Sequence, residues 1–301
     1  MAAEIIEFFG YPPLHPNGVD LSDRHHCPFV EERCTKVRGA CVIKQVTADP
    51  VIICPKRLYA QQFQILKDIA EEAFGVGTDL IDRREGQARV STGKYSGNEV
   101  VVFGYGHGGE LGIPAPSSPG STRSGTFKID FVLSRLNKDG SPQEFAAVEV
   151  QTIDTTGTYA PAAESYLKGL SYLNDKGGVT TSAGLNWENV SKRILPQIIY
   201  KGNVLKREEL CKKGLFFVLP HAVYEKIQAR IGSQLMEYPI SAGSVTFMTY
   251  DRAPEDGVHP TPLQKKTQFT TSVDQIAYAF VSPLNLPEKN AYAKAISNAM
   301  R

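Results

Sequence analysis

Four of the five cysteines gather near the N-terminus, and their spacing suits a metal site. They are Cys27, Cys34, Cys41 and Cys54. Prolines and glycines beside them hold turns open, so that several sulfur atoms can face one centre. Tetrahedral sulfur ligation suits zinc and iron alike, and four thiolates close the coordination shell, which makes the site structural. Cys211 stands apart and is expected to be a buried thiol.

The expected compartment favours a metal over disulfides. No hydrophobic N-terminal segment could serve as a secretory signal, so we expect a protein of the reducing cytoplasm. In a reducing compartment, clustered cysteines bind metal more often than they form disulfides. Separate buried thiols, or two disulfides in an exported protein, are the alternatives.

A second group of polar residues lies in two apolar segments that we predict to be strands. Asp130 stands in Phe-Lys-Ile-Asp-Phe-Val, and Glu149 and Gln151 stand in Ala-Val-Glu-Val-Gln. Residues i and i+2 of a strand share a face, so Glu149 and Gln151 project together, and Asp130 joins them if the strands pair. Two carboxylates and an amide carbonyl are hard oxygen ligands that suit Mg²⁺. Because an acid inside an apolar strand costs stability unless it is compensated, a site is favoured over two exposed strand residues.

The order of these residues has the shape of the nuclease pattern PD…(D/E)xK. Asp130 and Glu149-x-Gln151 supply the pattern, with Ile129 in place of the proline and Gln151 in place of the lysine. Alone, the pattern is weak, since two spaced carboxylates occur in most proteins. Its position in apolar strands gives it weight.

The remaining sequence predicts an α/β core with a mixed sheet flanked by helices. Strands are expected at 99–105, 126–133, 145–152 and 215–219, and helices at 59–74, 158–172 and 221–231. We expect a metal-binding region over residues 1–58 and a catalytic domain over residues 59–301. The segment Gly104-x-Gly106-x-x-Gly109 matches the dinucleotide fingerprint by letter, but the prolines that follow exclude the helix that a pyrophosphate needs.

The amino-acid composition excludes few classes of protein. Apolar residues make up 42% and charged residues 22%, as in ordinary globular proteins, and no apolar run approaches a membrane span, so no membrane partner is expected. The net charge of +1 does not by itself announce nucleic acid binding. A basic cluster over residues 192–213 is, taken alone, a solvated helix face.

Several blocks of the chain resemble the NotI-type restriction endonucleases, from about Ile5 to Leu219. The blocks are Cys27-Pro28-Phe29, Arg38-Gly39-x-Cys41-Val42, Cys54-Pro55, Gly108-Gly109-Glu110-Leu111, Phe127-x-x-Asp130, Val148-Glu149-Val150-Gln151-Thr152-x-Asp154-x-x-Gly157-x-Tyr159, Asn189-Val190-x-Lys192-Arg193 and Gln197-x-x-Tyr200-Lys201. A C-terminus shorter than that of NotI itself resembles the six-base cutters of the EagI type.

The resemblance implies a type II restriction endonuclease with a PD-(D/E)xK core, acting on double-stranded DNA as a homodimer. It implies Mg²⁺-dependent cleavage of both strands at a GC-rich palindrome, with a GGCC core, and one iron ion in the four-cysteine site, zinc being the alternative. A cognate DNA methyltransferase would share the recognition sequence but need not bind the enzyme. On this interpretation Asp130 and Glu149 hold Mg²⁺, Glu110 assists, and Gln151 orients a water molecule or lends its carbonyl to the metal.

Specificity for guanine would come from Arg or Lys side chains in the major groove. The expected DNA-binding residues are Arg83, Arg84, Arg89, Arg123, Lys192 and Arg193. Two other functions stay open at this point. A metal-stabilised DNA-binding protein without catalysis leaves the carboxylates unexplained, and a metalloenzyme acting on small molecules is disfavoured by the closed cysteine shell.

Overall fold

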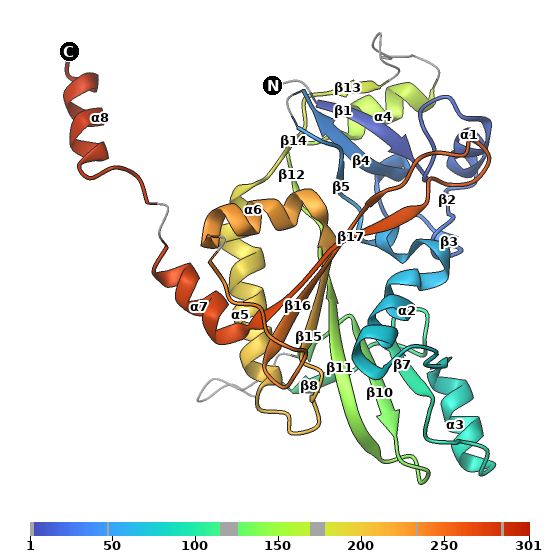
Figure 1. Ribbon diagram of the computed structural model, residues 1–301. Coiled ribbons are helices and arrows are strands. Elements are labelled where there is room, and N and C mark those ends of the chain that lie inside the picture. Colours follow the sequence, from blue (N-terminus) through green and yellow to red (C-terminus); the bar gives the residue numbers. More distant parts are fainter. Residues whose placement is uncertain (1–2, 47, 115–125, 169–177, 233, 284–285) are drawn as a thin grey trace, which may run out of the picture.

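A seven-stranded mixed sheet forms the centre of the molecule (Figure 1). The computed structural model describes residues 3–46, 48–114, 126–168, 178–232, 234–283 and 286–301. In sheet order the strands are β17 (Leu263–Ser272), β16 (Ser244–Arg252), β15 (Leu215–Pro220), β11 (Pro142–Val150), β10 (Phe131–Leu136), β7 (Val100–Gly104) and β6 (Leu80–Asp82). Strands β11, β15 and β16 run parallel, whereas β10 is antiparallel to both β7 and β11. The predicted mixed sheet is confirmed.

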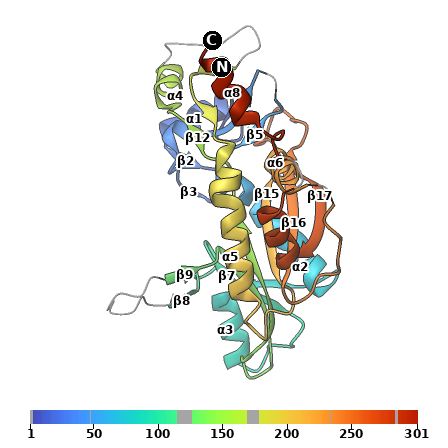
Figure 2. The same cartoon turned by 90° about the vertical axis from the view of Figure 1, so that its left-hand side faces the viewer.

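Helices cover both faces of this sheet (Figures 1 and 2). Helix α2 (Ala60–Phe74) packs on one face, and α5 (Leu195–Leu205), α6 (His221–Ile231) and α7 (Val273–Val281) pack on the other. Strand β15 is apolar throughout because it is buried on both sides: Phe216 faces the α2 core, and Phe217 faces the α5–α6 core.

The other helices and short strands complete the described part of the chain. They are α1 (Pro16–Asp23), α3 (Arg83–Ser91), α4 (Ala160–Leu167), α8 (Ala291–Ala299), the 3₁₀ turns η1 (Val37–Gly39) and η2 (Pro55–Tyr59), the π-helical turn η3 (Val190–Ile194), and the strands β2 (His26–Cys27), β3 (Glu32–Arg33), β8 (Gly112–Pro114), β9 (Thr126–Lys128), β12 (Thr155–Thr156) and β14 (Gly184–Leu185). Helix α4 is shorter than the helix predicted over 158–172; the end of that prediction lies outside the described residues.

A second, four-stranded sheet packs at the N-terminal end. Its order is β13 (Val179–Thr181), β1 (Ala3–Phe8), β4 (Ala40–Gln45) and β5 (Val51–Ile52). Because β13 comes from the middle of the chain, this sheet is not built from residues 1–58 alone. The division of the chain at residue 58 stays a prediction.

Two strand predictions need correction near the carboxylates. The segment 126–133 is split, because β9 pairs with β8 and ends at Lys128, whereas β10 pairs with β7 and β11 and begins at Phe131. Asp130 therefore lies in the bend between two strands where the chain changes partners. Strand β11 ends at Val150, so Gln151 follows the strand instead of lying in it.

The glycines after β7 open no helix, as expected. Gly104 is bridged to Gly109, and the next element is β8. The dinucleotide interpretation is therefore excluded by the fold as well as by the prolines.

A buried ion-pair network ties the two sheets together. Glu7 of β1 is fully buried and contacts Arg57 Nε at 2.6 Å and Arg252 Nε at 2.8 Å. Arg57 is fully buried too and lies over the Phe29 ring. The network thus links β1, η2 and β16 through one carboxylate.

Glu7→Ala is expected to destabilise the protein by about 3–5 kcal/mol, because it leaves Arg57 buried without its counter-charge. Chemical unfolding monitored by circular dichroism measures the change. Asp20→Ala is the matched control: its pair with Arg24 is exposed, so removing it is expected to cost at most about 1 kcal/mol. Equal effects of the two substitutions would contradict this account.

Candidate active site

The fold brings Asp130 and Glu149 together. Asp130 Oδ2 accepts a hydrogen bond of 2.8 Å from the backbone nitrogen of Val150, the residue after Glu149. Phe131 pairs with Val148 across β10 and β11, so the bend at Asp130 lies beside the end of β11. Two carboxyl groups that are 19 positions apart in the sequence therefore lie at the same end of the neighbouring strands β10 and β11.

Gly104 allows this close approach. A Cβ atom on Gly104 would lie 2.5 Å from the Asp130 carbonyl oxygen and 2.3 Å from the Phe131 ring. The backbone at Gly104 also has a φ of +152°, a conformation that other residues rarely adopt. Gly104, the first glycine of the run that matches the nucleotide motif by letter, is thus explained by packing against the carboxylate bend.

Burial and like charge raise the pKa of both acids. Burial is the main cause for Glu149, the Asp130 carboxylate adds to it, and the pKa rises to about 7. Burial also raises the pKa of Asp130, while the Val150 N–H and the Lys201 ammonium lower it. Glu110 raises the pKa of Asp130 further, which places this third carboxylate within electrostatic reach.

A lysine missing from the predicted site pairs with Glu149. The Lys201 ammonium of α5 lies 2.5 Å from Glu149 Oε1, and both side chains are largely buried. Lys201 belongs to the Gln197-x-x-Tyr200-Lys201 block, but it also belongs to the basic cluster over residues 192–213, whose composition alone favours a solvated helix face. Its burial depends on how α5 packs on the sheet, which periodicity alone could not give.

Gln151 and Glu110 take different positions around the pair. The Gln151 side-chain amide donates to the Thr152 carbonyl oxygen at 2.8 Å. Glu110 is more exposed and contacts the Lys128 ammonium at 3.2 Å. Their proposed roles beside a metal stay predictions.

The carboxylate pair fits a divalent cation by its donors. Glu149 Oε2 is buried and has no hydrogen-bond partner, so one oxygen is left for a ligand that the protein does not supply. Mg²⁺ is commonly held by only one or two carboxylates together with phosphate and water oxygens. Among the residues that the structure describes, no group of three or more His, Cys, Asp or Glu side chains is placed to hold a metal ion. The pair is therefore compatible with such a site without forming a complete protein cage.

The raised pKa values of Asp130 and Glu149 predict that the stability of the metal-free protein depends on pH. Both acids bind protons more readily in the folded state, so the protein loses stability as pH rises from about the ordinary carboxyl pKa towards 7. Asp130→Asn removes one of the two like charges. It is expected to raise the unfolding temperature by a few degrees at pH 8 and by less at pH 5. Thermal unfolding in EDTA tests this, and an equal shift at both pH values would contradict it.

The four N-terminal thiols lie within electrostatic reach of one another and form no disulfides. All are free, and Cys27, Cys41 and Cys54 are buried. Cys27 donates a hydrogen bond to Cys34 that lowers the pKa of the Cys34 thiol to about 6, whereas burial raises the pKa of Cys41 and Cys54. Thiolates are suitable donors for iron or zinc. However, among the described residues no three His, Cys, Asp or Glu side chains lie close enough together to bind one metal ion. The four-cysteine site therefore stays a prediction.

The arginines expected to bind DNA differ in whether carboxylates of the protein already neutralise their charge. Arg89 contacts three carboxylates, those of Glu85 at 2.6 Å, Glu99 at 3.1 Å and Asp79 at 3.2 Å. Its charge is already matched, so the structure gives little reason to expect it at phosphate. Arg84, on the same helix α3, is exposed.

Of the other expected DNA-binding residues, Arg83 begins helix α3, and Lys192 and Arg193 lie elsewhere in the fold. Arg83 is partly buried beside the Gly108 carbonyl oxygen. Lys192 and Arg193 lie on η3, where they pair with Glu188 and Asp154 in exposed contacts. Exposed pairs of this kind open at little cost, so both residues stay available to DNA. Arg123 lies outside the described residues.

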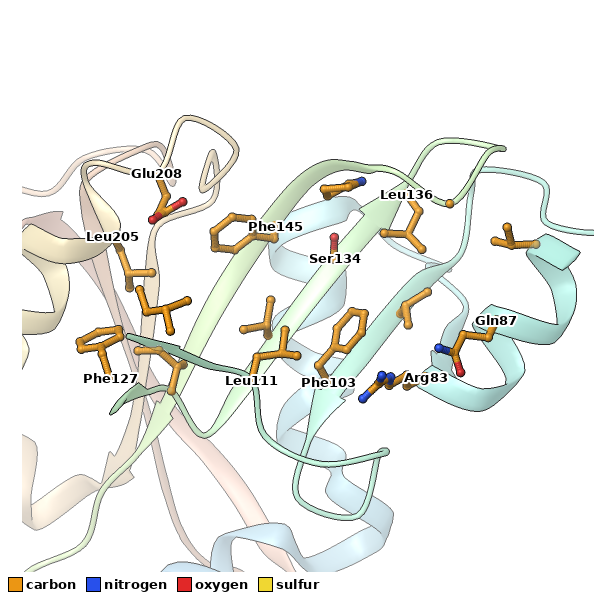
Figure 3. Close-up of a pocket in the computed structure, with 18 of the residues that line it drawn as sticks. Arg83, Gln87, Phe103, Leu111, Phe127, Ser134, Leu136, Phe145, Leu205 and Glu208 are labelled. Carbon is orange, nitrogen blue, oxygen red and sulfur yellow. The ribbon is translucent and has the colours of Figure 1, made fainter. Parts of the chain in front are cut away.

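One cavity is separate from the carboxylates. It has a volume of about 630 Å³ and lies over β7, β10 and β11, between α3 and the end of α5 (Figure 3). Apolar side chains such as Phe103, Leu136 and Phe145 line it, and neither Asp130 nor Glu149 does. This mostly apolar lining does not favour a phosphate group, so the carboxylate pair is the better candidate for an active site.

Comparison with known families indicates the class of protein. The family model described as restriction endonuclease NotI matches residues 113–251, which include Asp130, Glu149 and Lys201. Over this segment the chain is similar to the NotI restriction endonuclease family. The family consists of hydrolases that act on DNA, and such nucleases generally use a divalent metal ion. No curated protein matches the chain.

None of the described helices has both the length and the apolar character needed to cross a membrane.

Proposed function

We propose that the protein is a type II restriction endonuclease that hydrolyses both strands of double-stranded DNA at a GC-rich palindrome. The observation that carries the proposal is the pair formed by the partly buried Asp130 and the buried Glu149, within the segment that matches the NotI family. A buried like-charged pair is costly in a protein that has no use for it. We further propose that the sheet and its helices form a PD-(D/E)xK core.

The residues would act as follows. Asp130 and Glu149 would hold Mg²⁺, which supplies charge stabilisation at the scissile phosphate when bound. Gln151 would orient the attacking water, since an amide is neither a base nor a cation. Glu110 would accept a hydrogen bond from a water molecule at the exposed side of the pair. The four cysteines would hold one structural iron or zinc ion.

A palindromic site implies a two-fold dimer, because two identical half-sites are read most simply by two identical subunits. Each subunit would place one Asp130–Glu149 pair at one strand. Sedimentation of the protein on a DNA duplex carrying one site tests this. Two subunits per duplex support the dimer, and one subunit that makes double-strand breaks in a single event contradicts it.

Digestion of supercoiled plasmid DNA with and without Mg²⁺ tests the function. We expect linear products with Mg²⁺ and none in EDTA. Salt-sensitive DNA binding without cleavage in Mg²⁺ would favour the alternative, a non-catalytic DNA-binding protein. Cleavage that persists in EDTA would overturn the metal-dependent mechanism.

A further inference from the structure

Lys201 differs from the other basic residues near α5 in where its side chain lies. Lys206, at the end of the helix, pairs with Asp274 at the surface and its side chain is 47% exposed. The Lys201 side chain is only 16% exposed and reaches Glu149, which is 8% exposed. A lysine is rarely buried without a specific partner, so Lys201 is part of the carboxylate site.

Packing of α5 fixes this position. Ile198 and Leu205 are buried on the side of the helix that faces the core. Gly202 follows Lys201, and a Cβ atom there would lie 2.6 Å from Val273 Cγ2 of α7. The close contact between α5 and α7 therefore limits how α5 can rotate and keeps Lys201 directed at Glu149.

The strand itself offers no cation at this point. Gln151 stands two residues after Glu149, and its amide is engaged by the Thr152 carbonyl oxygen. The Lys201 ammonium lowers the pKa of both Asp130 and Glu149, so its charge is felt by the whole pair. A helix thus supplies the charge that the strand lacks.

We propose that Lys201 is a catalytic residue, whose ammonium donates to a non-bridging oxygen of the scissile phosphate. This inference rests on the proposed nuclease function. During hydrolysis, a bond forms between the water oxygen and phosphorus, and the bond between phosphorus and the 3′ oxygen breaks. The attacking water loses a proton to solvent, and the 3′ oxygen takes one up from solvent. Lys201 stays protonated and stabilises the negative charge that grows on the phosphoryl oxygens.

A purely structural role predicts a different result. If Lys201 only holds Glu149 in place, its loss disorders a metal ligand, and metal affinity and cleavage fall together. If Lys201 acts on the phosphate, its loss removes a positive charge that competes with a divalent ion for Glu149. Metal affinity without DNA then rises while cleavage falls.

The test uses Lys201→Gln, Lys201→Arg and the control Lys206→Gln. Single-turnover cleavage in Mg²⁺ and calorimetric titration with Ca²⁺ in the absence of DNA are measured for each. We expect Lys201→Gln to cleave on the order of 10²-fold more slowly and to bind Ca²⁺ roughly threefold more tightly. Lys201→Arg keeps the charge and should recover part of the rate, and Lys206→Gln should match the wild type.

Two results would overturn the inference. One is cleavage by Lys201→Gln within about threefold of the wild type, a smaller loss than removal of a charge-stabilising donor produces. The other is a Ca²⁺ affinity that falls in step with the rate. Either result leaves the proposed function intact, because the wild-type plasmid digestion is judged separately.

Discussion

Cleavage is expected to fall by on the order of 10³-fold or more when Asp130 is replaced by Asn or Glu149 by Gln. Each substitution keeps the shape of the side chain and removes a charge that would hold Mg²⁺ beside the phosphate. Specific binding to DNA in Ca²⁺ should survive in Asp130→Asn, because these carboxylates hold metal and do not read bases. Plasmid digestion and gel-shift titration measure the two properties.

Loss of folding cannot mimic this result for Asp130→Asn, which is expected to be more stable than the wild type at pH 8. Asp139→Asn is the matched control, since Asp139 lies in the exposed turn between β10 and β11. Its cleavage should equal that of the wild type. Retained cleavage in both Asp130→Asn and Glu149→Gln would place the chemistry elsewhere.

The second large effect concerns the N-terminal cysteines. Changing any one of Cys27, Cys34, Cys41 or Cys54 to Ser is expected to release the metal and to destabilise the N-terminal region by several kcal/mol, because metal binding energy in such sites is folding energy. Elemental analysis of the purified variants, together with thermal unfolding, measures both changes.

Cys211→Ser is the control for this series. Cys211 is buried beside the Gly214 carbonyl oxygen, far in sequence from the other four, and its loss should leave the metal content unchanged. Wild-type protein that is purified without bound iron or zinc would contradict the proposed four-cysteine metal site.

Local patterns predicted much of the fold. The apolar spacing of α2 and the continuous apolar run of β15 are visible in the sequence, since a buried helix face and a strand buried on both sides leave distinct periods. The bend at Asp130 is not visible, because β9 and β10 form one alternating segment whose two halves pair with different strands. Partner choice depends on the whole sheet.

The site was predicted in part for the same reason. Asp130 and Glu149 stand out because acids in apolar strands need compensation. Lys201 does not stand out, because the sequence of a basic cluster does not show which lysine faces solvent and which faces a carboxylate. Only the packing of α5 against α7 separates it from Lys206. Long-range packing of this kind has no local pattern.

A crystal structure of the protein on its DNA site with Mn²⁺ tests the central claim most directly. The anomalous signal of the ion gives its position independently of any assigned role. We predict a peak within about 2.5 Å of carboxylate oxygens of both Asp130 and Glu149, next to the scissile phosphate. A peak at the phosphate that is bound by other side chains, with Asp130 and Glu149 left unliganded, would contradict the account.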